Sequence, residues 1–131
     1  EILRVITRYD PIAHSTAMIR RSALDAVGVY SERFPRCQDY DLFLRIAAHF
    51  KVANLNAFML KYRISRTQGK YVHMRDSLKL TIGLQREWLL HRPFFNPYNL
   101  AYWGAEHLLL LLPRTLVLDL FKRVAYRSAR A

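Results

Sequence analysis

The most regular pattern of hydrophobic and polar positions in the chain begins at residue 38. Leu42, Ile46 and Phe50 recur at helical spacing after a polar start at Gln38 or Asp39. Apolar residues repeated at this interval form one stripe along a helix, and that stripe is buried against a core. The pattern therefore predicts an amphipathic helix that begins at Gln38 or Asp39 and ends near Phe50.

The C-terminal half shows the same periodicity over longer stretches. It predicts a long amphipathic helix over 71–90, a break over 91–97 that contains two prolines, and two further helices over 98–112 and 113–127. Pro113 suits a first helical turn, where its missing N–H costs nothing.

The N-terminal half has shorter elements. Three short segments rich in β-branched and apolar residues predict strands: 14–20, 51–55 and 58–64. Between the first two lies a predicted short helix over 23–27, with Ser22 as its N-cap and Gly28 as its end.

Composition and charge narrow the class of protein. The chain has 131 residues, 52% of them hydrophobic, which is enough for a packed core in a domain of modest size. Its formal net charge of +11 favours an anionic partner such as a diphosphate, an anionic membrane surface or nucleic acid. A single cysteine, Cys37, excludes an internal disulfide and fits a reducing compartment. The chain does not begin with Met, so we expect it to be a fragment or a processed product.

Two acids at the start of the predicted helix are candidate functional groups. Asp39 and Asp41 suit a helix N-terminus for electrostatic reasons alone, and Asp41 can pair with Arg45 four residues later. The functional alternative is a carboxylate base at the mouth of a cleft. Composition alone favours the structural role. A metal-binding Asp-x-Asp is excluded, because the apolar run follows these acids at helical period instead of delivering them from a buried strand.

Two other groups of residues carry both a structural and a functional interpretation. His14 stands beside two hydroxyls and is either a strand-edge histidine or a contact for phosphate or acceptor. Arg66 lies in the loop over 65–70, and Arg63 lies just before it. This basic stretch is either a solvated loop or one that can close on a diphosphate leaving group.

The tail is both aromatic and basic. Tyr98, Tyr102 and Trp103 lie among leucines, and basic residues follow in the last predicted helix. This pattern fits a helix lying on an anionic membrane, and it fits equally well a helix that packs on another part of a larger protein. The longest apolar run, 108–112, is far too short to cross a bilayer.

Four segments in order resemble the family 2 (GT-A type) glycosyltransferases of the bacterial branch that builds surface polysaccharides of the cell envelope. They are Asp10-Pro-Ile-Ala-His-Ser-Thr-Ala-Met-Ile-Arg-Arg-Ser-Ala-Leu24, Val27-Gly-Val-Tyr30, Phe34-Pro-Arg-Cys-Gln-Asp-Tyr-Asp-Leu-Phe-Leu-Arg-Ile-Ala47, and a continuation in Val52-Ala-Asn-Leu55 and Tyr62-Arg-Ile64. The resemblance implies an α/β, helix-rich fold: residues 1–70 as the acceptor-side half of a GT-A domain, with short mixed strands and packed helices, and 71–131 as an amphipathic helical extension.

The resemblance also implies residue roles. Asp39 matches the general base that deprotonates the acceptor hydroxyl, and His14 matches a histidine near the donor and acceptor cleft. Gln38 stands where the family has a glutamate. We expect His14, Gln38, Asp41, Arg63 and Arg66 to bind substrate, with the two arginines on the side of the leaving group.

The expected activity is inverting transfer of a sugar from a nucleotide-sugar to a glycan or lipid-linked acceptor. The intact enzyme would use Mg²⁺ or Mn²⁺, with ligands outside this chain, so we expect the chain by itself to lack transferase activity. The resemblance favours the cytoplasm, at the inner face of the cell membrane, with peripheral contact to anionic lipid. The alternative is a non-catalytic basic module that binds a membrane or a partner. Nucleic acid is not an expected partner, because the basic residues are scattered and form no known binding motif.

Overall fold

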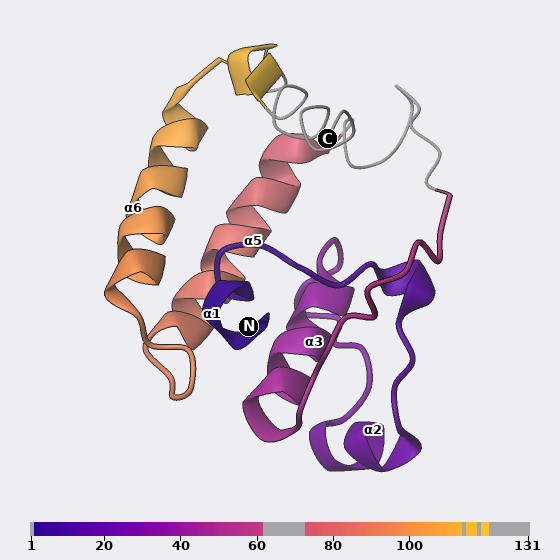
Figure 1. The fold of residues 1–131 in the computed structure, drawn as a ribbon. Helices are drawn as coiled ribbons and strands as arrows, with labels where there is room; N and C mark the ends of the chain where they lie inside the picture. The colour runs from indigo at the N-terminus through magenta and orange to yellow at the C-terminus, as the bar shows by residue number, and fades with distance from the viewer. Residues whose placement is uncertain (1, 62–72, 114, 118, 121–131) are drawn as a thin grey trace.

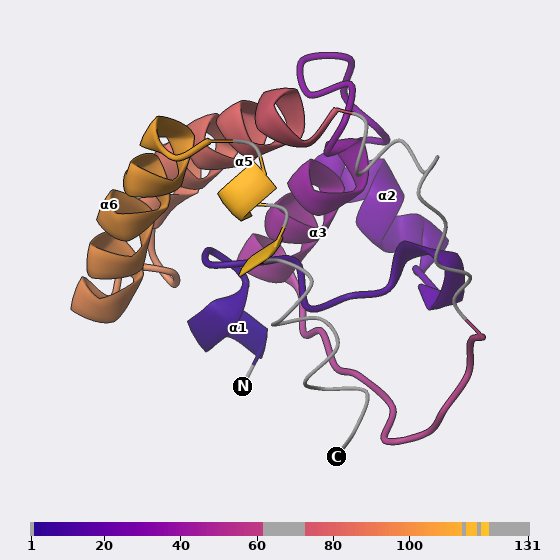
Figure 2. The same cartoon turned by 90° about the horizontal axis from the view of Figure 1, so that it is seen from above.

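The structure, a computed structural model, describes residues 2–61, 73–113, 115–117 and 119–120. Its elements are helical (Figure 1): α1 (Ile2–Val5), the 3₁₀ turn η1 (His14–Thr16), α2 (Arg21–Val27), α3 (Gln38–His49), α5 (Met74–Leu89) and α6 (Pro97–Leu111). Residues 115–117 and 119–120 are also helical. In two perpendicular views, α5 and α6 lie side by side on one flank, α2 and α3 form the other, and α1 lies between them (Figures 1 and 2).

The predicted amphipathic helix is confirmed as α3. The helix starts at Gln38, and the N–H of Phe50 closes its last turn on the carbonyl of Ile46 at 2.8 Å. Leu42, Leu44 and Ile46 are buried, so the apolar stripe faces the interior as its spacing requires.

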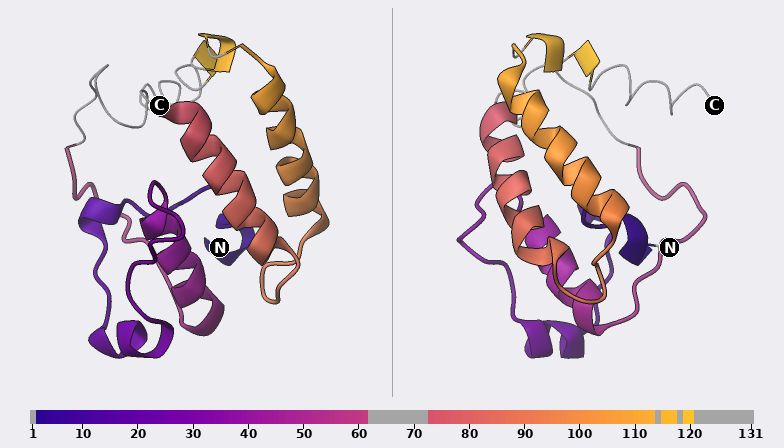
Figure 3. Two further views of the ribbon diagram at one scale, coloured as in Figure 1. Left: turned by 180° about the vertical axis from the view of Figure 1, so that it is seen from behind. Right: turned by 90° about the vertical axis from the view of Figure 1, so that its left-hand side faces the viewer.

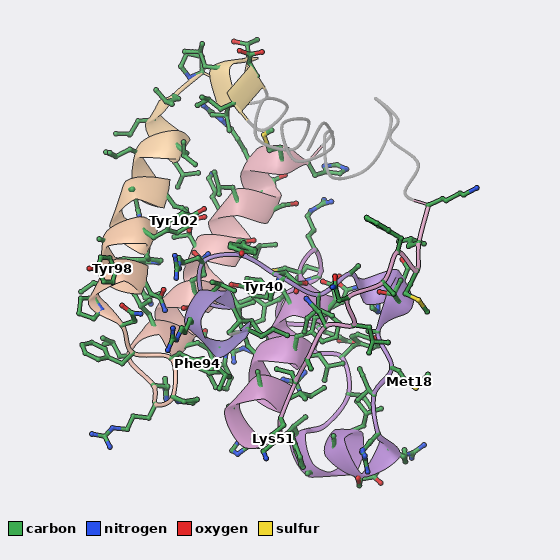
Figure 4. The ribbon with its side chains drawn as sticks, in the orientation of Figure 1. Met18, Tyr40, Lys51, Phe94, Tyr98 and Tyr102 are labelled. Atoms are coloured by element: carbon green, nitrogen blue, oxygen red, sulfur yellow. The ribbon has the colours of Figure 1, made fainter. Side chains whose placement is uncertain are left out.

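One core joins the two flanks. Tyr40 and Leu44 of α3 pack with Ile6 after α1, Leu84 of α5 and Phe94 of the 91–97 turn. The buried Tyr40 hydroxyl donates a hydrogen bond to the carbonyl of Ile6, which holds the N-terminal segment on α3. Figure 4 shows Tyr40 and Phe94 in this central region. The predicted boundary near residue 70 falls within 62–72, outside the described residues, and the core uses side chains from both sides of it.

The α5–α6 hairpin matches the predicted helices closely. The prolines end α5 and start α6: Pro97 occupies the first helical turn, and the Asn96 side chain caps α6 by accepting a hydrogen bond from the N–H of Tyr98 at 2.9 Å. Figure 3 shows from behind and from the side that α6 runs along α5 over most of its length. Within the described ranges, no helix combines the length and apolar character that a membrane span needs.

The expected strands are wrong for the part of the chain that the structure describes, and with them the α/β fold of a GT-A half. Residues 2–61, 73–113, 115–117 and 119–120 contain helices, turns and irregular backbone but no strand. The predicted strand over 14–20 is η1 followed by backbone that forms no strand, and 51–61 forms no backbone hydrogen bond with any other described residue. Residues 62–64 lie outside the described residues. The physical reason is that a strand exists only through hydrogen bonds to a second strand, whereas a helix satisfies its own backbone.

The short helix over 23–27 is confirmed, but its start differs. α2 begins at Arg21, so Ser22 lies inside the helix and does not cap it. Gly28 ends α2 with φ +81°, and its N–H donates to the carbonyl of Leu24 at 2.8 Å. This left-handed conformation favours glycine, and it turns the chain toward Tyr30.

Candidate functional site

The first turn of α3 brings two of the predicted site residues together. Asp39 is the second residue of α3, and its Oδ2 lies 3.6 Å from Nδ1 of His14 in η1. Its other oxygen, Oδ1, accepts a hydrogen bond from the N–H of Tyr40 at 2.9 Å. About a third of the Asp39 side chain (34%) and half of the His14 side chain (49%) remain exposed. A solute can therefore reach both groups, as a proton-transfer site requires.

Aromatic rings hold His14 in place. Its Nε2 lies 2.8 Å from the Tyr30 hydroxyl, and the Tyr30 ring meets the imidazole edge-on with centroids 5.7 Å apart. Phe43 of α3 makes a second edge contact at 6.2 Å. His14 thus has Asp39 at one ring nitrogen and a phenol at the other. Sequence reasoning assigned no function to Tyr30, although it belongs to one of the segments that carry the resemblance.

Asp10 adds a second carboxyl group near the first. Its Oδ1 accepts a hydrogen bond from the N–H of Ile12 at 2.9 Å, which fixes the turn before Pro11. Burial raises the pKa of Asp10 to about 6, the negative charge of Asp39 adds to this, and the Ile12 N–H and His14 oppose it. Nothing in the sequence pattern places Asp10 near Asp39, because 28 intervening residues must fold back to bring them together.

Asp41 has an ion-pair partner within its own helix. It is buried, and its Oδ2 lies 2.8 Å from Nη2 and 3.0 Å from Nε of Arg45. The guanidinium also donates to the carbonyls of Val27 and Val29, the latter at 2.7 Å. This Asp41–Arg45 clamp fixes the turn after α2 and so positions Tyr30 at His14. The carboxylate that was predicted to bind substrate therefore holds the scaffold of the site.

The remaining predicted residues contribute less to the described geometry. Gln38 starts α3 as an exposed residue, and its side chain makes no hydrogen bond to any described residue. Arg63 and Arg66 lie outside the described residues. The nearby Cys37 is buried in the core, and burial raises the pKa of its thiol to about 11, which makes it a packing residue and a poor nucleophile at neutral pH.

A second polar cluster lies between α5 and α6. Glu106 of α6 is 9% exposed and Gln85 of α5 is fully buried, and one oxygen of each side chain lacks a hydrogen-bond partner. Burial raises the pKa of Glu106 to about 7, with the Gln85 amide and His107 opposing the shift. Tyr102 lies close enough that the Glu106 charge contributes to its own raised pKa, after burial. Because Glu106 is largely buried and Gln85 fully so, this cluster bears on stability.

The ligands of the expected Mg²⁺ or Mn²⁺ were predicted to lie outside this chain. Within the described ranges, no three His, Cys, Asp or Glu side chains form a group that could hold a metal ion.

Comparisons with known proteins leave the geometry as the main guide. No protein-family model, no curated protein and no solved structure matches the chain. What the site can do follows from its own groups: an accessible carboxylate beside an imidazole can accept a proton from a hydroxyl that approaches the start of α3.

Proposed function

We propose that this chain supplies the acceptor-activating part of an inverting glycosyltransferase that uses a nucleotide-sugar donor. The observation that carries the proposal is the accessible Asp39 carboxylate, 3.6 Å from His14 at the start of a helix. The resemblance of the segments around both residues to family 2 glycosyltransferases supplies the reaction class. The strand-containing half-domain that the resemblance implied is not part of the proposal.

In the proposed reaction Asp39 acts as general base. The acceptor O–H bond breaks and its proton passes to the carboxylate, while the acceptor oxygen forms a bond to the anomeric carbon of the donor sugar. The bond between that carbon and the diphosphate oxygen breaks, and the nucleoside diphosphate leaves with the electron pair. Direct displacement of this kind inverts the anomeric centre.

The other groups of the site support that step. His14 lies beside the carboxylate that accepts the proton, and Tyr30 and Phe43 fix the ring's position. Asp39 lies in the first turn of α3, near the positive end of the helix dipole. The Asp41–Arg45 clamp keeps this geometry by holding the turn that carries Tyr30.

For the donor, the proposal names only its class, a nucleotide-sugar. Arg63 and Arg66 remain proposed contacts for the diphosphate, and the Mg²⁺ or Mn²⁺ of the intact enzyme would be held by residues outside this chain. By itself the chain is therefore proposed to lack transferase activity.

The proposed location is the inner face of the cell membrane, and α6 supports it. The helix exposes Tyr98, Leu108 and Leu111 by 78%, 61% and 80%, whereas its buried residues are Asn99 and Glu106. A helix with this outward apolar face fits contact with lipid, and the chain's net charge of +11 favours anionic headgroups. The same face supports the rival function, a non-catalytic module that binds a membrane or a partner.

Asp39→Asn in the intact protein separates the two functions. We expect sugar transfer to fall by about 10²–10⁴-fold, the usual contribution of a general base, while binding to anionic vesicles is unchanged. Asp25→Asn is the matched control, because Asp25 is an exposed acid of α2 that, among the described residues, pairs with Arg21 alone. Transfer that survives Asp39→Asn would disprove the base assignment, and loss of transfer in both variants would disprove its specificity.

A further inference from the structure

A large open hollow lies on the flank opposite α6. It encloses about 1200 Å³ between residues 11–23 and 50–60, over a floor that includes Phe43 and Ile46 of α3. Its rim exposes large apolar side chains: Met18 is 97% exposed, Leu55 78% and Phe58 fully. Figure 4 shows Met18 at the edge of the molecule away from Tyr98 and Tyr102. Apolar exposure on this scale marks an interaction surface.

Part of the backbone along this hollow forms no hydrogen bond with the described residues. Among the described residues, no backbone hydrogen bond involves 51–60, and none involves Met18 or Ile19. The two walls are joined by the Asn54 side chain, which donates to the carbonyl of Pro11 at 2.9 Å. The backbone is extended at Ala17 (φ −69°, ψ 131°) and at Arg20 (φ −68°, ψ 137°). Figure 1 shows 51–61 as a drawn-out segment that passes the region of η1.

These two features together select the kind of occupant. A lipid chain would cover the apolar side chains but would leave the unpaired N–H and C=O groups without partners in a dry environment, which is costly. An extended polypeptide covers the side chains and also pairs with the backbone. The charged side chains that line the hollow, Arg20 and Lys51, are both cationic, so an occupant with acidic residues at its ends is complementary.

We propose that this hollow binds an extended polypeptide segment, with alternating apolar side chains and acidic ends, that adds as a β-strand along residues 51–60, facing the wall formed by 17–20. Its apolar side chains fill the space over Phe43 and Ile46, and its backbone pairs with the free edge. The binding needs no sugar chemistry and is independent of the role of Asp39. Its failure would therefore leave the proposed function untouched.

The test uses the complete 131-residue chain and a synthetic probe. The probe is a fluorescent peptide of about ten alternating Val and Thr residues with Glu at each end, long enough to span about 33 Å when extended. Its partner probe has the same side chains but is N-methylated at alternate residues, which removes donors along one edge. Binding is measured by fluorescence anisotropy, and amide hydrogen exchange of the chain is followed with each probe.

We expect saturable binding of the first probe, with slowed exchange at amides of 51–60, and about tenfold or greater loss of affinity on N-methylation. Phe58→Asp should weaken binding by about tenfold or more without affecting the fold, since Phe58 is fully exposed. Leu111→Asp, at an apolar position of α6 that is 80% exposed, should leave binding unchanged.

Three results would overturn the proposal. The first is equal affinity for the methylated and unmethylated peptides. The second is probe binding without amide protection along 51–60, as a purely apolar site would give. The third is protection of 51–60 in the chain without probe that rises with the chain's own concentration, because a second copy would then be the occupant.

Discussion

Replacement of Glu106 by Gln should make the protein more stable at alkaline pH. Glu106 lies 9% exposed between α5 and α6, close to Gln85 and Tyr102, with one carboxyl oxygen unpartnered. Burial raises its pKa from 4.5 to about 7. The folded state therefore favours the neutral acid, and glutamine keeps that neutral state at every pH.

The sign and size of the effect follow from linkage. Because the folded pKa of Glu106 lies above its unfolded value, the unfolded chain loses this proton first as the pH rises. The contribution of Glu106 to the free energy of unfolding is then most favourable in acid, falls between about pH 4.5 and pH 7, and levels off above that. At about 1.4 kcal/mol for each pKa unit, the full loss is about 3 kcal/mol, of which about 2.5 kcal/mol falls between pH 5 and pH 8.

Urea unfolding followed by circular dichroism at pH 5 and pH 8 measures this difference. We expect the free energy of unfolding of the Glu106→Gln protein to exceed that of the unmodified protein by about 2–3 kcal/mol at pH 8 and by under about 1 kcal/mol at pH 5. Glu32→Gln, an exposed glutamate before α3, serves as the control and should leave the pH dependence unchanged. A Glu106→Gln protein with the same loss of stability between pH 5 and pH 8 as the parent would refute the reasoning.

Two further predictions concern the turn that positions Tyr30. Gly28→Ala should lower the free energy of unfolding by about 1 kcal/mol, because alanine is strained at the positive φ of +81° even though no atom clashes with its Cβ. Gly104→Ala, where the added Cβ meets open space within α6, should raise the free energy of unfolding by about 0.5–1 kcal/mol. Equal effects of the two substitutions would contradict this argument. Arg45→Lys should cost about 1–3 kcal/mol in thermal unfolding, since an ammonium cannot reach Asp41 and two carbonyls at once, and an unchanged melting temperature would show that the clamp is dispensable.

The helices were predictable because their signals are local. The apolar stripe of α3, the prolines on either side of residue 95 and the glycine after α2 act within a few residues of themselves. A helix closes its hydrogen bonds inside one segment, so a short window of sequence contains most of the information that defines it. The start of α2 at Arg21 instead of beyond Ser22 shows the usual limit of that information at a helix end.

The structure brings together some of the residues predicted for the site. The resemblance named His14 and Asp39 separately as site residues, and the structure places His14 Nδ1 3.6 Å from Asp39 Oδ2. The resemblance also gave Asp41 a substrate-binding role, whereas the structure occupies that carboxylate with Arg45. It assigned nothing to Asp10 or Tyr30, because their places beside Asp39 and His14 depend on the path of the chain between η1 and α3.

The sequence by itself thus determined α2, α3, α5 and α6 to within a few residues, and which face of α3 is buried, but it predicted neither α1 nor η1. Only the tertiary structure decided whether 14–20 and 51–61 form strands, since apolar and β-branched residues favour a strand but cannot supply the second strand it requires. It also decided that Glu106, the single acid of α6, lies in the interior while Tyr98, Leu108 and Leu111 face outward. The local sequence pattern determines helices, because their hydrogen bonds close within one segment. Whether a side chain is buried depends instead on which distant segments pack against it.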